Sequence, residues 1–197
     1  MLSADETQSA LAGAWRLMFG KADGFRLLDL SADGFWNSFF AIVVALPAMI
    51  VSWVAIANEI GDPDALAGRF GMVLRLATID LGTWVLPLLF LAFVAPRAGI
   101  GGRFVHYVVA SNWASAIVAW LMLPSALVRL FVPAADQAAG VLSLVLFMLT
   151  MVMTWRMTNA AIGKGAAVGT AVFAGMFVAS LIVLFALQAL LGVTVPE

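Results

Sequence analysis

Long uncharged apolar runs are the feature that most limits what this chain can fold into. Five separate stretches of the 197 residues approach the length of a membrane span and are almost free of charge. A helix rising about 1.5 Å per residue needs about 20 apolar residues to cross the hydrocarbon core of a bilayer. Hydrophobic residues make up 64% of the chain and charged residues 11%, and a small soluble domain cannot bury that much apolar surface. The chain is therefore expected to be a polytopic membrane protein, which excludes a soluble enzyme, a disordered segment and a nucleic-acid-binding protein.

The predicted fold class is all-α, a polytopic membrane protein with five transmembrane helices and an interfacial amphipathic helix before them. The spans are expected at about residues 35–57, 73–94, 104–123, 138–155 and 166–191. These runs are too long for the strands of an outer-membrane barrel and lack the alternation that such strands show. Residues 1–34 then form a separate N-terminal segment, and the transmembrane domain covers residues 35–197.

Lysine and arginine residues are distributed unevenly between the two sides of the predicted spans. Seven of the ten lie on the N-terminal side: Arg16, Lys21, Arg26, Arg97, Arg103, Arg156 and Lys164. The opposite side has Arg69, Arg75 and Arg129. Because cytoplasmic flanks carry the excess of basic residues, the N-terminus is predicted to be cytoplasmic and the C-terminus outside. No secretory signal peptide is recognised, so a prokaryotic plasma (inner) membrane is the expected location.

One amphipathic helix is predicted in the N-terminal segment, from about Thr7 to Phe19. Leu11, Trp15 and Met18 fall on one face of it. A helix of this kind can lie in the cytoplasmic interface of the membrane. It can equally pack on the end of the helix bundle, and the sequence leaves both alternatives open.

Residues that carry most enzyme chemistry are missing from the chain. It has no cysteine and a single histidine, His106, which excludes disulfides, thiolate metal sites and multi-histidine clusters. Hydrolase, nucleotide-binding and dinucleotide-binding motifs are also absent. The chain is therefore not expected to be an enzyme or to hold a cofactor or metal. Glu59, Asp62 and Asp64 could together bind a hard cation, but Asp62-Pro63 is explained more simply as a helix start.

Asp80 is the one acidic residue inside a predicted span, in the outer third of the second span. A carboxylate at membrane depth is costly and marks either a functional site or a specific structural contact. Arg75 is five residues away and lies on another face of the helix, so Arg129 is the predicted partner. The candidate polar site consists of Asp80, Arg129 and Arg75. It either fixes helix packing or handles protons or cations, unless Asp80 lies at a solvated interface.

Small residues recur at every fourth position of the fifth predicted span: Ala167, Ala171, Gly175 and Ala179. This spacing lets two helix backbones approach closely in lipid. The row is expected to pack against another helix of the same chain, and contact with a second copy is the alternative.

Three prolines interrupt the predicted spans. Pro47, Pro87 and Pro124 each remove a helix hydrogen bond and are expected to kink the first, second and third spans. Pro124 lies just beyond the predicted end of the third span, so it is also a candidate for the end of that helix.

Two short stretches resemble elements of a known family. The stretch DLSADGFW, residues 29–36, is similar to the Asp-Leu-x-Gly-Pro element of the Yip-domain family, membrane proteins that interact with Ypt/Rab GTPases. Two residues are inserted and Phe35 replaces the proline. The stretch GGRF, residues 101–104, resembles the glycine-basic linker of the prokaryotic members. The family-motif residues are Asp29, Leu30, Gly34 and Trp36.

The resemblance implies five spans, a cytoplasmic N-terminal segment and a non-enzymatic role in the membrane. Two functions then remain open. One is a Yip-like membrane organiser or accessory subunit that binds the lipid bilayer, other membrane proteins or a second copy of itself. The other is a transporter of a small solute or ion that uses Asp80 and the proline-kinked helices. A polar cavity containing Asp80 would favour the transporter, and a filled bundle with Asp80 paired would favour the organiser.

Overall fold

The computed structural model of this protein describes residues 2–60 and 66–193. The regular secondary structure of these residues is all helical, with turns and short loops between the helices, and the predicted all-α fold class is confirmed. The α-helices are α1 (Ala4–Met18), α2 (Ala32–Asn37), α3 (Phe40–Ile60), α4 (Leu66–Val94), α5 (Phe104–Phe131), α6 (Asp136–Ile162) and α7 (Ala166–Leu191). Short 3₁₀ turns, η1 (Ala22–Leu27), η2 (Gly101–Arg103) and η3 (Pro133–Ala135), lie in the connections. Five segments are long and apolar enough to cross a membrane, with α2 and α3 counted as one.

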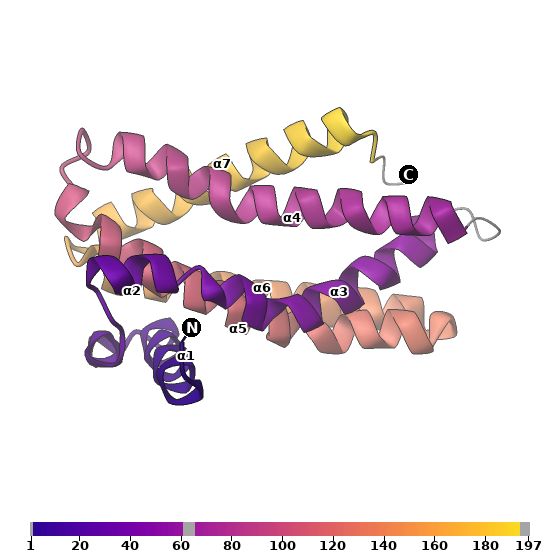
Figure 1. Cartoon of the computed structure of the whole chain (residues 1–197), viewed down its shortest axis with the longest axis horizontal. Helices are drawn as coiled ribbons and strands as arrows, with labels where there is room; N and C mark the ends of the chain where they lie inside the picture. The colour runs from indigo at the N-terminus through magenta and orange to yellow at the C-terminus, as the bar shows by residue number, and fades with distance from the viewer. Residues whose placement is uncertain (1, 61–65, 194–197) are drawn as a thin grey trace.

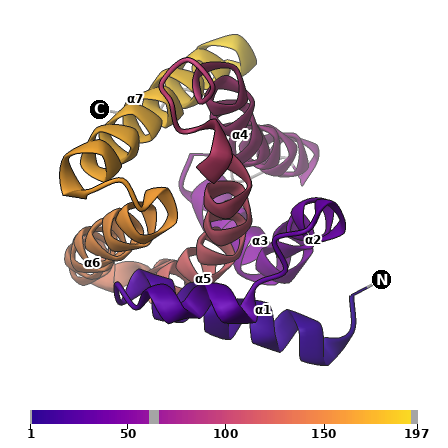
Figure 2. The same cartoon turned by 90° about the vertical axis from the view of Figure 1, so that its left-hand side faces the viewer.

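The five spans form a ring. α3 packs against α4, α4 against α7, α7 against α6, α6 against α5, and α5 against α3. In Figure 1 this ring appears as two layers, α4 and α7 above and α3, α5 and α6 below. Figure 2 looks along the bundle from the end that carries α1. We call this end, with its seven lysine and arginine residues, the basic end.

Three spans, α4, α5 and α6, are longer than the sequence predicts. α5 continues through Pro124 to Phe131 instead of ending near residue 123. A proline removes one backbone donor, but the helix on its C-terminal side can re-form, so an internal proline bends a membrane helix without stopping it. α6 continues past Trp155 to Ile162, where Gly163 ends it at φ +59°. Pro47 and Pro87 also lie inside continuous helices, and Figure 1 shows α3 changing direction along its length.

A break in the first span falls at Ser38, at a position that the sequence did not predict. The Ser38 hydroxyl donates to the Phe35 carbonyl (2.7 Å) and accepts from the Asn112 side-chain amide (2.8 Å). Side-chain hydrogen bonds of this kind compete with the regular helix ladder. The chain therefore turns between α2 and α3, and α2 is set apart as a short helix.

Tryptophan indole groups join neighbouring spans of the ring. Trp120 donates to the Val44 carbonyl of α3 at 2.9 Å, three residues before Pro47, where the missing proline N–H loosens the helix ladder. Trp155 of α6 donates to the Thr170 hydroxyl of α7, also at 2.9 Å. An indole N–H is a donor that must find a partner in lipid, so these contacts help to fix the helix order.

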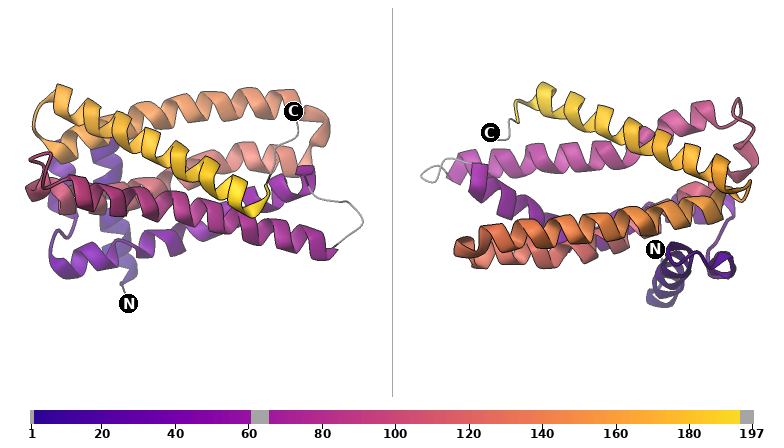
Figure 3. Two further views of the ribbon diagram at one scale, coloured as in Figure 1. Left: turned by 90° about the horizontal axis from the view of Figure 1, so that it is seen from above. Right: turned by 180° about the vertical axis from the view of Figure 1, so that it is seen from behind.

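The N-terminal helix runs across the bundle axis at the basic end (Figures 2 and 3). It begins at Ala4 with a capping box between Ser3 and Glu6. Leu17 and Met18 are fully buried against the bundle, and α1 packs on α5 and α6. The structure thus shows the packed alternative. The side chains predicted to share one apolar face of this helix differ in exposure: Trp15 is 42% exposed, whereas Met18 is buried.

Candidate functional site

Asp80 lies at the middle of its span. The span that contains it runs from Gly68 to Val94, twelve residues before it and fourteen after it. α4 begins several residues earlier than the apolar pattern suggests, so Asp80 lies nearer the middle of its helix than the predicted bounds place it.

The structure does not bring Asp80 and Arg129 together. Asp80 accepts a hydrogen bond from the indole N–H of Trp53 on α3, with 2.6 Å between nitrogen and oxygen. Arg129 pairs with Glu59 at 3.4 Å, at the end of the bundle opposite the basic end. Arg75 is exposed on α4. The predicted Asp80–Arg129 pair is therefore replaced by a neutral indole donor and a separate ion pair near the membrane surface.

Asp80 lies on the wall of a cavity inside the ring. The cavity has a volume of about 430 Å³, and all five spans contribute side chains to it. Its α4 wall consists of Asp80, Thr83, Trp84, Pro87 and Leu88. Spacings of three and four residues place these side chains on one helix face. Asp80 is thus on the inward face of α4, and its side chain is exposed rather than enclosed by protein.

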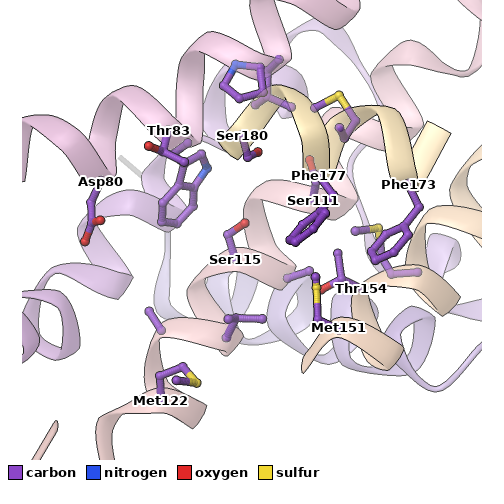
Figure 4. Close-up of a pocket in the computed structure, with 18 of the residues that line it drawn as sticks. Asp80, Thr83, Ser111, Ser115, Met122, Met151, Thr154, Phe173, Phe177 and Ser180 are labelled. Carbon is purple, nitrogen blue, oxygen red and sulfur yellow. The ribbon is translucent and has the colours of Figure 1, made fainter. Parts of the chain in front are cut away.

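Hydroxyl groups are spread around the cavity wall. They belong to Ser52, Thr83, Tyr107, Ser111, Ser115, Thr154 and Ser180. The Thr83 hydroxyl oxygen is buried and makes no hydrogen bond within the described part of the chain. Figure 4 shows Ser111, Ser115 and Ser180 along the cavity between Asp80 and the phenylalanines of α7. A buried hydroxyl without a partner is satisfied by water or by a polar solute.

A hydrogen-bonded network borders the cavity. The indole of Trp84, which lines the cavity, donates to the side-chain oxygen of Asn112 at 2.9 Å. The Asn112 amide in turn donates to Ser38 at the break between α2 and α3. Asn112 and Ser38 are both fully buried. The network therefore connects α4, α5 and the start of α3, and a fully satisfied polar network makes a rigid wall.

The small-residue row of α7 is more exposed than the predicted close packing against a helix of the same chain requires. Ala167, Ala171 and Gly175 are exposed and Ala179 is half-buried, and open space surrounds the position of a Cβ atom on Gly175. The row therefore does not form a close contact between helices of the same chain. Gly169 does, because a Cβ atom there would lie 2.3 Å from the Asn159 side-chain oxygen of α6.

The family-motif residues form the connection into α2. Asp29 accepts a hydrogen bond from the Ser31 N–H at 2.9 Å, and this bond holds the pKa of Asp29 below its usual value. A Cβ atom on Gly34 would lie 2.2 Å from the Asp29 carbonyl oxygen. Leu30 is half-buried, whereas Trp36 is 71% exposed. Asp29 and Gly34 therefore form a tight turn that leads into α2.

Two carboxylates of the N-terminal segment also have lowered pKa values. The Arg16 guanidinium donates to Asp23 from its Nε at 3.1 Å and lowers the pKa of that carboxyl group. The Ser3 backbone N–H donates to Glu6 at 2.7 Å and has the same effect on Glu6. These contacts order α1 and η1 and lie outside the cavity.

Other predicted residues lie away from the cavity as well. His106 packs edge-on against Phe25 of η1, with 5.5 Å between the ring centres. Asp62 and Asp64 of the acidic loop lie outside the described residues. Groups of three or more metal-ligating side chains (histidine, cysteine, aspartate or glutamate) do not occur among the described residues.

Comparison with known proteins gave no match: no family model, curated protein or solved structure is similar to this chain. The resemblance to the Yip-domain family therefore depends on the motif residues alone.

Sequence reasoning found Asp80 but missed most of the site around it. Trp53, Trp84 and Asn112 read as ordinary span residues, because their partners lie on other helices. One pattern in the sequence does point to the cavity. Ser111 and Ser115 are four residues apart, which places two hydroxyl groups on one face of an apolar span.

Proposed function

We propose that this integral membrane protein binds a small solute in the cavity inside its ring of spans and carries it across the bilayer. The observation that carries the proposal is the cavity with Asp80 on its wall at the middle of a span. Its volume of about 430 Å³ is in the range of about 300–1,000 Å³ typical of small-molecule sites. A carboxylate at this depth is expensive, and binding of a solute is a reason to keep it.

Thermal unfolding of the purified protein in a neutral detergent tests the proposal. The Tm is measured with each member of a panel of solutes: amino acids, sugars, amines and quaternary ammonium ions. A solute that binds only the folded state raises the Tm, so we expect at least one to raise the Tm of the wild type. Ser115→Trp should abolish this response, because an indole at position 115 fills the cavity. Val145→Trp is the control, because Val145 is 58% exposed on α6 and does not line the cavity.

Two outcomes of the unfolding experiment would contradict the solute-binding proposal. In the first, no member of the panel raises the Tm of the wild type. In the second, Ser115→Trp keeps the response of the wild type, which would locate binding outside the cavity.

A second candidate is the Yip-like organiser or accessory subunit. The observation that favours it is the exposed row of small residues on α7, which is available to another helix. Oxidation of Gly175→Cys in native membranes tests self-association, with the exposed position Val145→Cys as control. A dimer specific to position 175 would support this candidate. Equal cross-linking at both positions would count against it.

We further propose that the basic end faces the cytoplasm of a prokaryotic cell. Seven of the ten lysine and arginine residues support this orientation. A membrane-impermeant thiol reagent should label Val132→Cys in intact cells and leave Gly101→Cys unlabelled until the cells are lysed. The reverse labelling pattern would show that the basic end faces the outside of the cell.

A further inference from the structure

We infer that the ligand of this cavity is an amphipathic organic cation, with its charged group at Asp80 and its apolar body against the aromatic side chains of α7. This inference rests on the proposed function and names the class of solute. In Figure 4 Asp80 lies at one end of the cavity, and the apolar side chains of Phe173, Phe177 and Met151 lie at the other, with Thr154 beside them.

The charged end lacks a basic partner within the described part of the chain. The hydrogen bond to Asp80 comes from the neutral indole of Trp53. The two ion pairs of the described residues are Arg16–Asp23 and Arg129–Glu59. A carboxylate at membrane depth is stabilised by an opposite charge, and a cationic ligand in the cavity would supply it.

The opposite end is suited to an apolar or aromatic group. The rings of Phe173 and Phe177 are nearly parallel, with an interplanar angle of 11° and 6.5 Å between centres. Aromatic faces attract organic cations as well as apolar groups. Five methionines also line the cavity: Met49, Met122, Met151, Met157 and Met176. Methionine side chains are flexible and polarisable, and they adapt to ligands of different shapes.

An inorganic cation fits this lining less well. Calcium takes about six to eight oxygen ligands and magnesium about six, arranged closely around the ion. Among the described residues, Asp80 is the one carboxylate of the cavity wall, and the hydroxyl groups are spread over all five spans. Hydroxyls distributed along the cavity instead suit a larger polar group or bound water between the two ends.

A matched set of probes separates charge from shape. Phenyltrimethylammonium has a cationic group and an aromatic ring, tert-butylbenzene has the same shape without the charge, and tetramethylammonium has the charge without the ring. Radiolabelled phenyltrimethylammonium is bound to the full-length protein in neutral detergent, and the other two compete at equal aqueous activity. We expect phenyltrimethylammonium to bind at least about tenfold more tightly than either, because it alone uses both ends of the cavity.

Two variants locate the two ends. Asp80→Asn should weaken binding of phenyltrimethylammonium about tenfold and Phe177→Leu several-fold. Asp33→Asn and Phe93→Leu are the matched controls, since both residues are exposed and neither lines the cavity. Circular dichroism establishes that each variant is folded, and the comparison of probes on the wild type does not depend on any variant.

The outcomes separate this inference from the proposed function. Competition by tert-butylbenzene as strong as that by the unlabelled cation, or full binding by folded Asp80→Asn, overturns the inference. In that case the proposal that a solute binds in the cavity is retained if Ser115→Trp still abolishes binding. Failure of all three probes, together with no response from the solute panel, overturns both.

Discussion

At the scale of single residues, the site is defined by a carboxylate and a neutral donor. Trp53 is only 5% exposed and holds Asp80 from the neighbouring helix. A hydrogen bond to an ionised group is stronger than one between neutral groups, but an indole does not neutralise the charge. Asp80, when ionised, therefore remains available to a cation while its position is fixed.

Removal of the indole donor should destabilise the protein. Trp53→Phe keeps an aromatic ring at this buried position and leaves Asp80 without its partner, so we expect a loss of about 1–2 kcal/mol in the free energy of unfolding. Denaturant titration in detergent micelles measures this loss of free energy. The double variant with Asp80→Leu, which removes the acceptor oxygens, should lose less than the two single variants together. Trp113→Phe is the control for ring size, since Trp113 is 3% exposed. Strict additivity of Trp53→Phe and Asp80→Leu would contradict a direct contact.

Gly34 should not tolerate a larger side chain. A Cβ atom there would lie 2.2 Å from the Asp29 carbonyl oxygen, and backbone cannot move aside cheaply. We expect Gly34→Ala to cost about 1–3 kcal/mol in the same titration. Gly102→Ala at the same end meets nothing within 4 Å, so its effect should stay within about 0.5 kcal/mol. Equal stability of the two variants would argue against the close turn.

Asp80 could be identified from the sequence because a carboxylate contrasts with an apolar span. Its partner could not, because Trp53 is 27 residues away and an indole is not a charge that pairing rules would select. Arg129 carried the right charge for Asp80 but lies beside Glu59. At this scale, long-range packing decides which of several possible donors is used.

At the scale of elements, hydrogen bonds to carboxylates order the N-terminal segment, and buried side chains of α1 pack it on the bundle. Glu6, Asp23 and Asp29 each accept hydrogen bonds that lower their pKa values. A lowered pKa in the folded state means that these contacts stabilise the segment above the unfolded-state pKa of about 4. The stabilisation is lost as the pH falls through the lower, folded-state values.

Acidification should therefore loosen the N-terminal segment itself before the spans unfold, because the three contacts lie within it. Spin labels at the exposed positions Gln8→Cys and Ala22→Cys report the distance from α1 to η1. We expect one narrow distance distribution near pH 7 and a broader one below about pH 4. Changing Glu6, Asp23 and Asp29 to their amides should broaden the distribution already at neutral pH. A distribution unaffected by pH would show that the three carboxylates do not order the N-terminal segment.

The five spans could be predicted because each is an uncharged run of nearly the required length, but their ends could not. Pro124 and Trp155 have the character of terminal residues, yet both lie inside longer helices. The break at Ser38 was missed for the opposite reason. It depends on a hydrogen bond from Asn112, 74 residues away along the chain.

At the scale of the whole molecule, the ring order depends on α7 returning to α4. This contact is between elements far apart in the sequence, and no local pattern indicates it. A Cβ atom on Gly82 would lie 2.4 Å from the end of the Leu187 side chain. The two helices therefore meet closely there and close the ring around the cavity.

Cysteine pairs can test this ring directly because the chain has no cysteine of its own. Gly82→Cys with Leu187→Cys should form a disulfide under mild oxidation in membranes, since the Leu187 side chain reaches the position of a Cβ atom on residue 82. Gly82→Cys with Val145→Cys should not, because Val145 lies on the outer face of α6. Cross-linking of the second pair in place of the first would require a different order of helices.

The central claim is that a solute can enter the membrane domain and reach the cavity at Asp80. Reaction of Ser115→Cys with a membrane-impermeant trimethylammonium methanethiosulfonate in proteoliposomes tests it most directly, with lipid-facing Val145→Cys for comparison. We predict that position 115 reacts at least about tenfold faster than position 145, because a thiol ionises and reacts in water and not in lipid. Adding Asp80→Asn should slow the reaction with this cation. Equal, slow labelling at the two positions would contradict the claim.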